Sequence, residues 1–118
     1  MTWFPVIVIA ASALFRQQVD QGIARFAPGE LAYVRGITLS QSVAPAWCGT
    51  TEMQNTGGVW TTTGVIALVE SDRCMSGTDE VIHEICHALT PGRPGAFHTP
   101  AFWDCVHRHA STEVAFSD

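Results

Sequence analysis

The stretch Val81-Ile82-His83-Glu84-Ile85-Cys86-His87-Ala88-Leu89 decides the fold, because it sets the motif His-Glu-x-x-His in an apolar, helix-forming run. Residues four positions apart lie on one face of a helix, so His83 and His87 can offer two imidazole nitrogens to a single ion. Zinc (Zn2+) suits such a site, because it accepts neutral imidazole and leaves a fourth position open in catalytic centres. Glu84 follows His83 and lies too far round the helix to be a third ligand, so this pattern makes it the general base for a metal-bound water.

The sequence on either side of the motif predicts where this helix begins and ends. Residues 76–80, Ser-Gly-Thr-Asp-Glu, supply N-cap candidates and acidic first-turn side chains, and residues 90–92, Thr-Pro-Gly, supply a stop. The remaining motif residues provide a surface suited to a protein core: Val81, Ile82, Ile85, Ala88 and Leu89. The alternative interpretation is a buried helix whose two histidines are incidental.

A third protein ligand is expected, because catalytic zinc normally has three of them. His98 is the favoured candidate, since the loop after the motif helix can fold back over the ligand face of that helix; its alternative is a surface histidine. His107 and His109 lie further along the predicted last helix. They are expected either to be exposed to solvent or to contact the metal ligands rather than the metal itself. Asp104 is either a plain exposed residue or a carboxylate that orients a liganding imidazole.

Length and charge narrow the class of protein. The 118 residues have the size of one domain, so residues 1–118 are predicted to form a single domain. The net charge is −5, and the six basic residues are all arginines without a cluster, which argues against nucleic acid as the main partner. The apolar run of residues 2–13 is shorter than the ~20 residues of a membrane span. It also lacks the positive start of a secretory signal, which favours a cytoplasmic location.

The cysteines contain no Cys-x-x-Cys pair, which argues against a zinc ribbon. The four cysteines can form up to two disulfides, in three possible pairings, or stay as buried thiols, and Cys48 with Cys74 is the more plausible bridge. Cys86 on the motif helix and Cys105 on the last helix are predicted to be small core residues rather than ligands or nucleophiles.

The rest of the chain predicts helices at both ends and strands between them. Apolar residues at steps of three and four predict a packing helix over residues 5–26, and alternation predicts a strand over residues 30–39. Residues 47–53 and 59–69 are further strand material, and Asn and Gly in residues 54–58 indicate a hairpin turn. Thr99 and Pro100 are the N-cap and first residue of a final helix over residues 101–109. The expected fold is therefore α+β, with an N-terminal helix, a small mixed or antiparallel sheet, the motif helix and a C-terminal helix.

A resemblance to a known group rests on the motif segment His83-Glu84-Ile85-Cys86-His87-Ala88-Leu89 and on the later segment His98-Thr99-Pro100-Ala101-Phe102-Trp103. Ten residues separate His87 from His98. Together these resemble the SprT-like, Wss1-like and YgjP-like zinc metallopeptidases, in which a downstream His and an aromatic pair follow His-Glu-x-x-His. The resemblance covers about residues 79–107. It implies a minimal zincin-like domain with His83, His87 and His98 as metal ligands and Glu84 as the catalytic base.

Departures from related patterns limit what the resemblance implies. A metzincin would have Gly at position 90 and His at position 93, where this chain has Thr90 and Arg93. The basic or zinc-ribbon extensions of the DNA-linked SprT-like members are absent from this sequence, so their substrate role is not carried over.

The expected function is a zinc-dependent metallopeptidase that hydrolyses peptide bonds by Glu-assisted attack of a zinc-bound water. Its partner is a peptide or protein substrate, and an exposed edge strand in residues 59–69 is expected to pair with it. The sequence does not choose the donor for the oxyanion. The alternatives are a zinc-stabilised, non-catalytic binding or structural protein on a zincin scaffold and a hydrolase of a non-peptide amide.

Overall fold

The computed structural model describes residues 4–56, 59–90 and 98–110, and for residues 52–56 and 59–63 it describes the backbone. The elements along these residues are β1 (Val6–Val8), α1 (Ala13–Ile23), α2 (Pro28–Leu31), β2 (Gly36–Gln41), β3 (Gly49–Thr56), β4 (Val59–Glu70), α3 (Gly77–Leu89) and α4 (Pro100–His109). The α+β class predicted from the sequence is confirmed.

The strands form one mixed sheet in the order β1-β2-β4-β3. The strands β1, β2 and β4 run parallel, and β3 pairs antiparallel with β4. Thr56 pairs with Val59, so the hairpin lies where the sequence predicts it; Gly57 and Gly58 lie outside the described residues. Of the two sheet types expected, the mixed one is therefore present.

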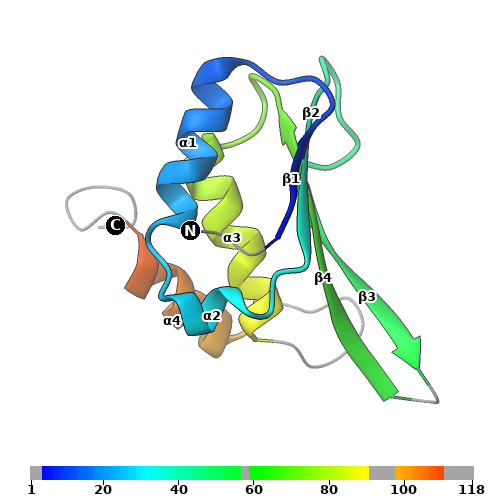
Figure 1. Ribbon diagram of the computed structural model, residues 1–118, viewed down its shortest axis with the longest axis vertical. Coiled ribbons are helices and arrows are strands. Elements are labelled where there is room, and N and C mark those ends of the chain that lie inside the picture. The colour runs from blue at the N-terminus through cyan, green and yellow to red at the C-terminus, as the bar shows by residue number, and fades with distance from the viewer. Residues whose placement is uncertain (1–3, 57–58, 91–97, 111–118) are drawn as a thin grey trace.

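The helices cover one side of this sheet (Figure 1), and the core lies between the two layers. Alternate residues of β2 and β4 point into it, because successive side chains of a strand face opposite ways. The fully buried strand residues are Ile37, Leu39, Ile66 and Leu68, and those of the helices include Val19, Val81, Ile82, Ile85 and Phe102. Burial of each such side chain contributes about 1.5–3 kcal/mol, so this layer dominates the stability of the fold.

The helices α1 and α3 pack closely at a glycine. A Cβ atom at Gly22 would collide with the Val81 side chain and with the backbone carbonyl oxygen of Thr78. Two further bonds join the helices: Gln18 accepts a hydrogen bond from the Gly77 backbone N–H, and its own carbonyl accepts one from the Thr78 hydroxyl. The start of the motif helix is thereby fixed against α1.

The long N-terminal helix predicted over residues 5–26 is wrong in its first half. Val6–Val8 is a strand instead, held beside β2 by a bond from the Ile37 N–H to the Pro5 carbonyl oxygen. Consecutive β-branched residues favour a strand. The helix begins only after Ser12, whose hydroxyl accepts a hydrogen bond from the Phe15 N–H at 3.1 Å.

The strand predicted over residues 30–39 begins later than expected. Pro28–Leu31 is a short helix, α2, because Pro28 occupies its first turn and the Glu30 carboxylate accepts a hydrogen bond from the Ala27 N–H at 2.8 Å. The strand itself, β2, runs over Gly36–Gln41. Such a local cap outweighs the loose alternation of the sequence.

The expectation that residues 59–69 supply an exposed edge strand is wrong for Ile66–Leu68, where β4 pairs with β2 on one side and with β3 on the other. Residues 59–62 of β4 pair with β3 and not with β2. The strand with a free edge next to the motif helix is β3. This difference moves the expected peptide-pairing edge from β4 to β3.

The two helices that carry the motif residues begin and end as predicted. Ser76 caps α3, Thr90 ends it, and the Thr99 hydroxyl accepts a hydrogen bond from the Phe102 N–H to cap α4, with Pro100 in its first turn. No helix in the described part of the chain is long and apolar enough to cross a membrane.

Candidate metal centre

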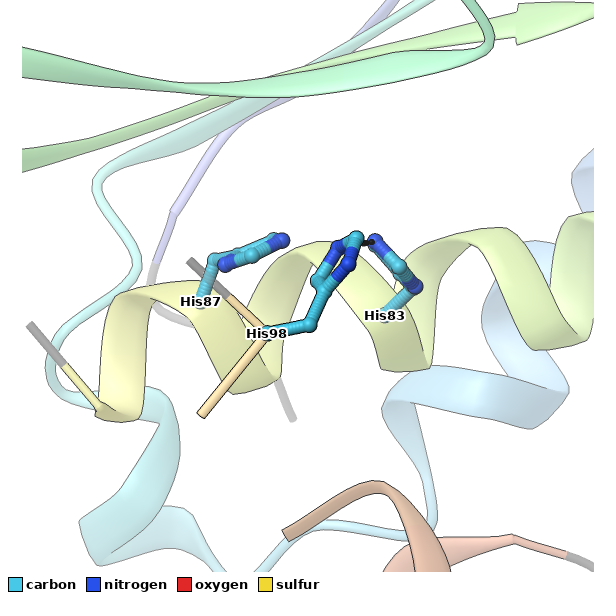
Figure 2. A group of neighbouring side chains, drawn as sticks. All are labelled: His83, His87 and His98. Atoms are coloured by element: carbon cyan, nitrogen blue, oxygen red, sulfur yellow. Dashed lines mark hydrogen bonds between the residues drawn. The ribbon is translucent and has the colours of Figure 1, made fainter. Parts of the chain in front are cut away.

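The helix α3 presents His83 and His87 on one face, one turn apart. Their ring centroids lie 4.9 Å from each other, and both side chains are half-buried. The third histidine comes from the segment just before α4. The Nε2 atoms of His98 and His83 are 3.3 Å apart, and Figure 2 shows the three rings gathered along α3.

One ring nitrogen of each histidine lies within 4.8 Å of the corresponding nitrogens of the other two. The sequence therefore names three residues that the structure brings together: His83, His87 and His98. Two of them are tied to a rigid helix, and the third is placed by the cap of the next helix. Sites on such elements hold their geometry well.

Burial and mutual proximity keep two of these imidazoles uncharged. Burial lowers the pKa of His83 to about 4, and the neighbouring His98 contributes to the shift. Burial likewise lowers the pKa of His87 to about 4, with contributions from His83 and His98. At neutral pH both rings are therefore neutral, which is the form that binds a metal.

The donor set fits zinc on a further observation. The Nδ1 atom of His87 is buried, and among the described residues it has no hydrogen-bond partner. A buried polar atom without a partner costs free energy. Three converging imidazoles, of which His83 and His98 contact each other through their Nε2 atoms at 3.3 Å, can share a cation, and nitrogen ligands suit zinc.

Aromatic side chains from α4 form one wall of the centre. Phe102 is fully buried and stacks on His87 with ring centroids 4.2 Å apart. Trp103 lies beside His98, at 5.3 Å between centroids, and stays 39% exposed. These are the two aromatics that the resemblance places at the start of the last helix. Packing against them restrains the rings of the ligand candidates.

Glu84 lies at the boundary between α3 and β3. Its side chain is 5% exposed, and the Thr51 hydroxyl lies 2.9 Å from both its Oε1 atom and its backbone carbonyl oxygen. Burial raises the pKa of Glu84 to about 7, against the lowering effect of the Thr51 bond. A carboxyl group with a pKa near neutrality is suited to general acid–base work.

Glu80 is an acidic residue in the first turn of α3, as the sequence predicts, but its burial is not indicated by the local sequence. It is 1% exposed, and its Oε1 atom accepts a hydrogen bond from the Val69 N–H at 2.8 Å. Burial raises its pKa to about 8, the Val69 bond opposes this, and the charge of Glu84 adds to it. Its spacing of four residues from Glu84 was the only signal for a shared face.

The other polar residues of α4 do not join the three histidines. Asp104 is exposed and pairs with Arg108 at 3.2 Å, so it is the plain surface residue of the two alternatives. His107 is exposed and lies beside Trp103. Arg93 lies outside the described residues.

The prediction that His109 is exposed to solvent or lies next to the metal ligands is wrong. Rather than being solvated, it is 7% exposed and stacks on Phe26 with centroids 4.0 Å apart. Its Nε2 atom lies 3.0 Å from Glu30 Oε2, and its Nδ1 atom lies 2.7 Å from the Cys105 carbonyl oxygen. It therefore joins α4 to α2 rather than serving the metal centre.

The cysteines form two disulfides. Cys48–Cys74 is the pair favoured from the sequence. Cys86 and Cys105 are fully buried in the core, as predicted, and they also form the second bridge, between α3 and α4. This bridge links the residue before His87 to the helix whose first turn follows His98.

Comparison of the chain with models of protein families, with curated proteins and with solved structures found no match.

Proposed function

We propose that this protein is a zinc-dependent metallopeptidase. The observation that carries the proposal is the convergence of His83, His87 and His98 beside a buried glutamate. A purely structural metal site has no use for such a base. The zincin-like assignment is part of the same proposal, and the arrangement of sheet, motif helix and ligand-bearing segment before α4 supports it.

In this proposal, separate residues bind the metal, transfer the proton and orient the base. The imidazoles of His83, His87 and His98 hold the metal, which when bound acts as a Lewis acid and acidifies water. Glu84 accepts a proton from the attacking water and passes it to the leaving amine. Thr51 orients Glu84 by its bond to Oε1. Phe102 keeps bulk water away from the inner side of the histidines.

The substrate in this proposal is an extended peptide that pairs with the free edge of β3. This edge strand carries Thr51, which contacts Glu84, so a peptide paired with it passes close to the base. Pairing through the main chain gives affinity with little dependence on sequence. A broad substrate range is therefore expected.

A second function, zinc-stabilised binding without catalysis, is favoured by one observation. Glu84 is 5% exposed and its carboxylate already accepts a hydrogen bond from Thr51, so a bound peptide reaches Glu84 only if the residues that bury it move away. On this view zinc joins α3 to the segment before α4 and stabilises the fold. Zinc content without cleavage of any peptide or amide would support it.

The first experiment is metal analysis of the purified chain beside His98→Ala. His107→Ala is the matched control, because His107 is an exposed histidine of α4. About one zinc per chain is expected in the wild type and the control, with strong weakening in His98→Ala. A folded wild-type chain that takes up no zinc would refute the proposal.

The second experiment measures cleavage of unstructured protein substrates by Glu84→Gln. This variant keeps the size of the side chain and removes the base, so kcat is expected to fall by about 10²–10⁴ while zinc stays bound. Unchanged cleavage by Glu84→Gln would exclude Glu84 as the base.

A further inference from the structure

The disulfide between Cys86 and Cys105 joins the helix that carries two of the histidines to the helix that follows the third. Both cysteines are fully buried, and their Cα atoms lie 5.7 Å apart. Cys86 directly precedes His87 on α3, whereas Cys105 lies on α4, whose N-cap residue directly follows His98. The bridge therefore links the two sets of ligand candidates covalently, in addition to the main chain.

The ring that this bridge closes contains two of the three histidines. It runs over residues 86–105 and so includes His87 and His98. A metal ion held by both of these histidines closes a smaller loop inside the same ring. Closing a loop costs conformational entropy, and a cross-link that is already in place removes part of that cost. The oxidised chain is therefore better prepared to bind a metal.

The position of α4 decides where His98 lies. His98 is exposed, so burial does not fix its place. It is instead tied to the first turn of α4, because the hydroxyl of the adjacent Thr99 accepts a hydrogen bond from the Phe102 N–H at 3.2 Å. The Phe102 ring also lies 4.9 Å from that of His98, and Cys105 follows Phe102 by three residues, on the same face of the helix. A shift of α4 away from α3 would thus carry His98 away from the other two histidines.

We propose that the Cys86–Cys105 disulfide is a redox switch for the metal centre, so that the oxidised chain binds zinc more tightly than the reduced chain. In the switching step a dithiol reduces the bridge. The S–S bond breaks, two electrons and two protons pass to the two sulfurs, and the dithiol becomes a disulfide. Without the bridge, only non-covalent contacts hold α4 against α3. The inference rests on the zinc site of the proposed function, but not on Glu84 or on catalysis.

A coupling between two sites acts in both directions, so zinc must stabilise the bridge by the same factor by which the bridge tightens zinc binding. The loop-closure entropy of a ring of this size limits that factor to about a hundredfold. Packing of Phe102 on His87 already orders part of the ring. We therefore expect a factor of about ten, which corresponds to about 30 mV in the reduction potential of the bridge.

The first test measures zinc affinity by competition with a chelator, without any reductant. The double variant Cys86→Ser with Cys105→Ser removes the bridge and leaves no thiols that could bind zinc in its place. The matched control is Cys48→Ser with Cys74→Ser, which removes the other disulfide and leaves α4 unchanged. We expect the dissociation constant to rise about tenfold in the first double variant and to stay at the wild-type value in the control.

The second test uses the wild-type chain and so does not depend on the folding of a variant. The chain is equilibrated with a dithiol and its disulfide, without zinc and with saturating free zinc held constant by a chelator buffer. The thiols are then alkylated and identified by mass spectrometry. With zinc, half-reduction of Cys86–Cys105 should require a dithiol-to-disulfide ratio about ten times higher. Cys48–Cys74 is the internal control, for which we expect the same ratio under both conditions.

Wild-type zinc affinity in a folded chain without the Cys86–Cys105 bridge would overturn the proposal. A half-reduction ratio that zinc leaves unchanged, or lowers because the freed thiols take up the metal, would do the same. The proposed peptidase function fails on a different result, a zinc-loaded wild-type chain that cleaves nothing, and the coupling can still be measured in that chain. A wild-type chain that takes up no zinc would refute both.

Discussion

The pair of helices α3 and α4 carries two clusters of metal-binding side chains, and the protein treats them in opposite ways. The histidine cluster is His83, His87 and His98; the cysteine cluster is Cys86, Cys105 and His109. In each, one possible donor atom per residue lies within 4.8 Å of the others. Proximity of donors therefore does not distinguish them.

The two clusters differ in whether their donor atoms already have bonding partners within the protein. In the cysteine cluster, which is buried, the two sulfurs bind each other and both nitrogens of His109 have oxygen neighbours within 3.0 Å. In the histidine cluster the rings are more accessible, and the buried Nδ1 atom of His87 has no partner among the described residues. The histidine cluster is therefore the better candidate for a metal site, because it is the one without a covalent bond between its donors and with a buried ring nitrogen lacking a partner.

The largest effect is expected from removing one donor of each cluster in turn. His83→Ala should weaken zinc binding by about 4 kcal/mol, as roughly one ligand's share of the binding free energy of a zinc site. His109→Ala should leave zinc affinity unchanged. Competition titration with a chelator of known affinity measures both. Equal loss in the two variants would remove the distinction between the clusters.

The next effect concerns the disulfide of the cysteine cluster. Replacing Cys86 and Cys105 by Ser should lower the unfolding free energy by about 3 kcal/mol, because the bridge closes a loop of 19 residues. Chemical denaturation of the metal-free chain measures this.

Reduction of the disulfides in the wild-type chain tests whether the cysteine cluster binds a metal once its sulfurs are free. With the sulfurs free, metal analysis in the presence of a thiol-free reductant should still give about one zinc per chain, since His109 Nδ1 remains engaged with the Cys105 carbonyl. Two zinc ions per chain would mean that the cysteine cluster is a metal site whenever it is reduced.

A pH-dependent effect is expected from Glu80, which lies one helical turn before Glu84 on α3. Its pKa is raised from 4.5 to about 8 in the fold, so the folded chain binds the extra proton between these values. Its contribution to stability is full below pH 4.5 and is lost as pH rises to about 8. The slope has an upper limit of roughly 1.4 kcal/mol per pH unit.

Glu80→Gln should remove this slope. Unfolding of the metal-free wild type and the variant across that range measures the difference between the two curves, which cancels the contributions of the histidines. A difference that does not change with pH would mean that Glu80 is ionised in the folded chain.

The smallest effect is expected at the edge of the cysteine cluster. Glu30→Gln weakens the bond to His109 Nε2 and should cost about 1 kcal/mol of unfolding free energy, with no change in zinc content. The pair is partly exposed, which keeps the value small. Thermal unfolding with and without zinc checks both statements.

The parts of the fold that the sequence predicts are those set by local signals. Ser76 and Thr99 cap their helices through hydroxyl groups, and the motif spacing alone places two histidines on one face. His98 was predicted because the loop before it is short enough to return to the same helix.

The parts that the sequence misses depend on contacts between distant residues. The bridge between Cys86 and Cys105 requires the packing angle of α3 on α4, and the burial of Glu80 requires Gly49 opposite it. Strand β1 was missed because residues 4–26 share one apolar spacing across two elements. Disulfides persist mainly in oxidising compartments, so the cytoplasmic location stays a prediction that these bridges do not favour.

The disulfide between Cys48 and Cys74 encloses β3 and β4 in a covalent ring. Exposed loop tips are the preferred sites of cleavage by proteases, and a chain with the proposed activity would also be exposed to its own cleavage. A single cut between the two cysteines would leave both fragments joined. The nicked chain would migrate as one species until reduced, so its strand edge and motif helix would survive the damage together.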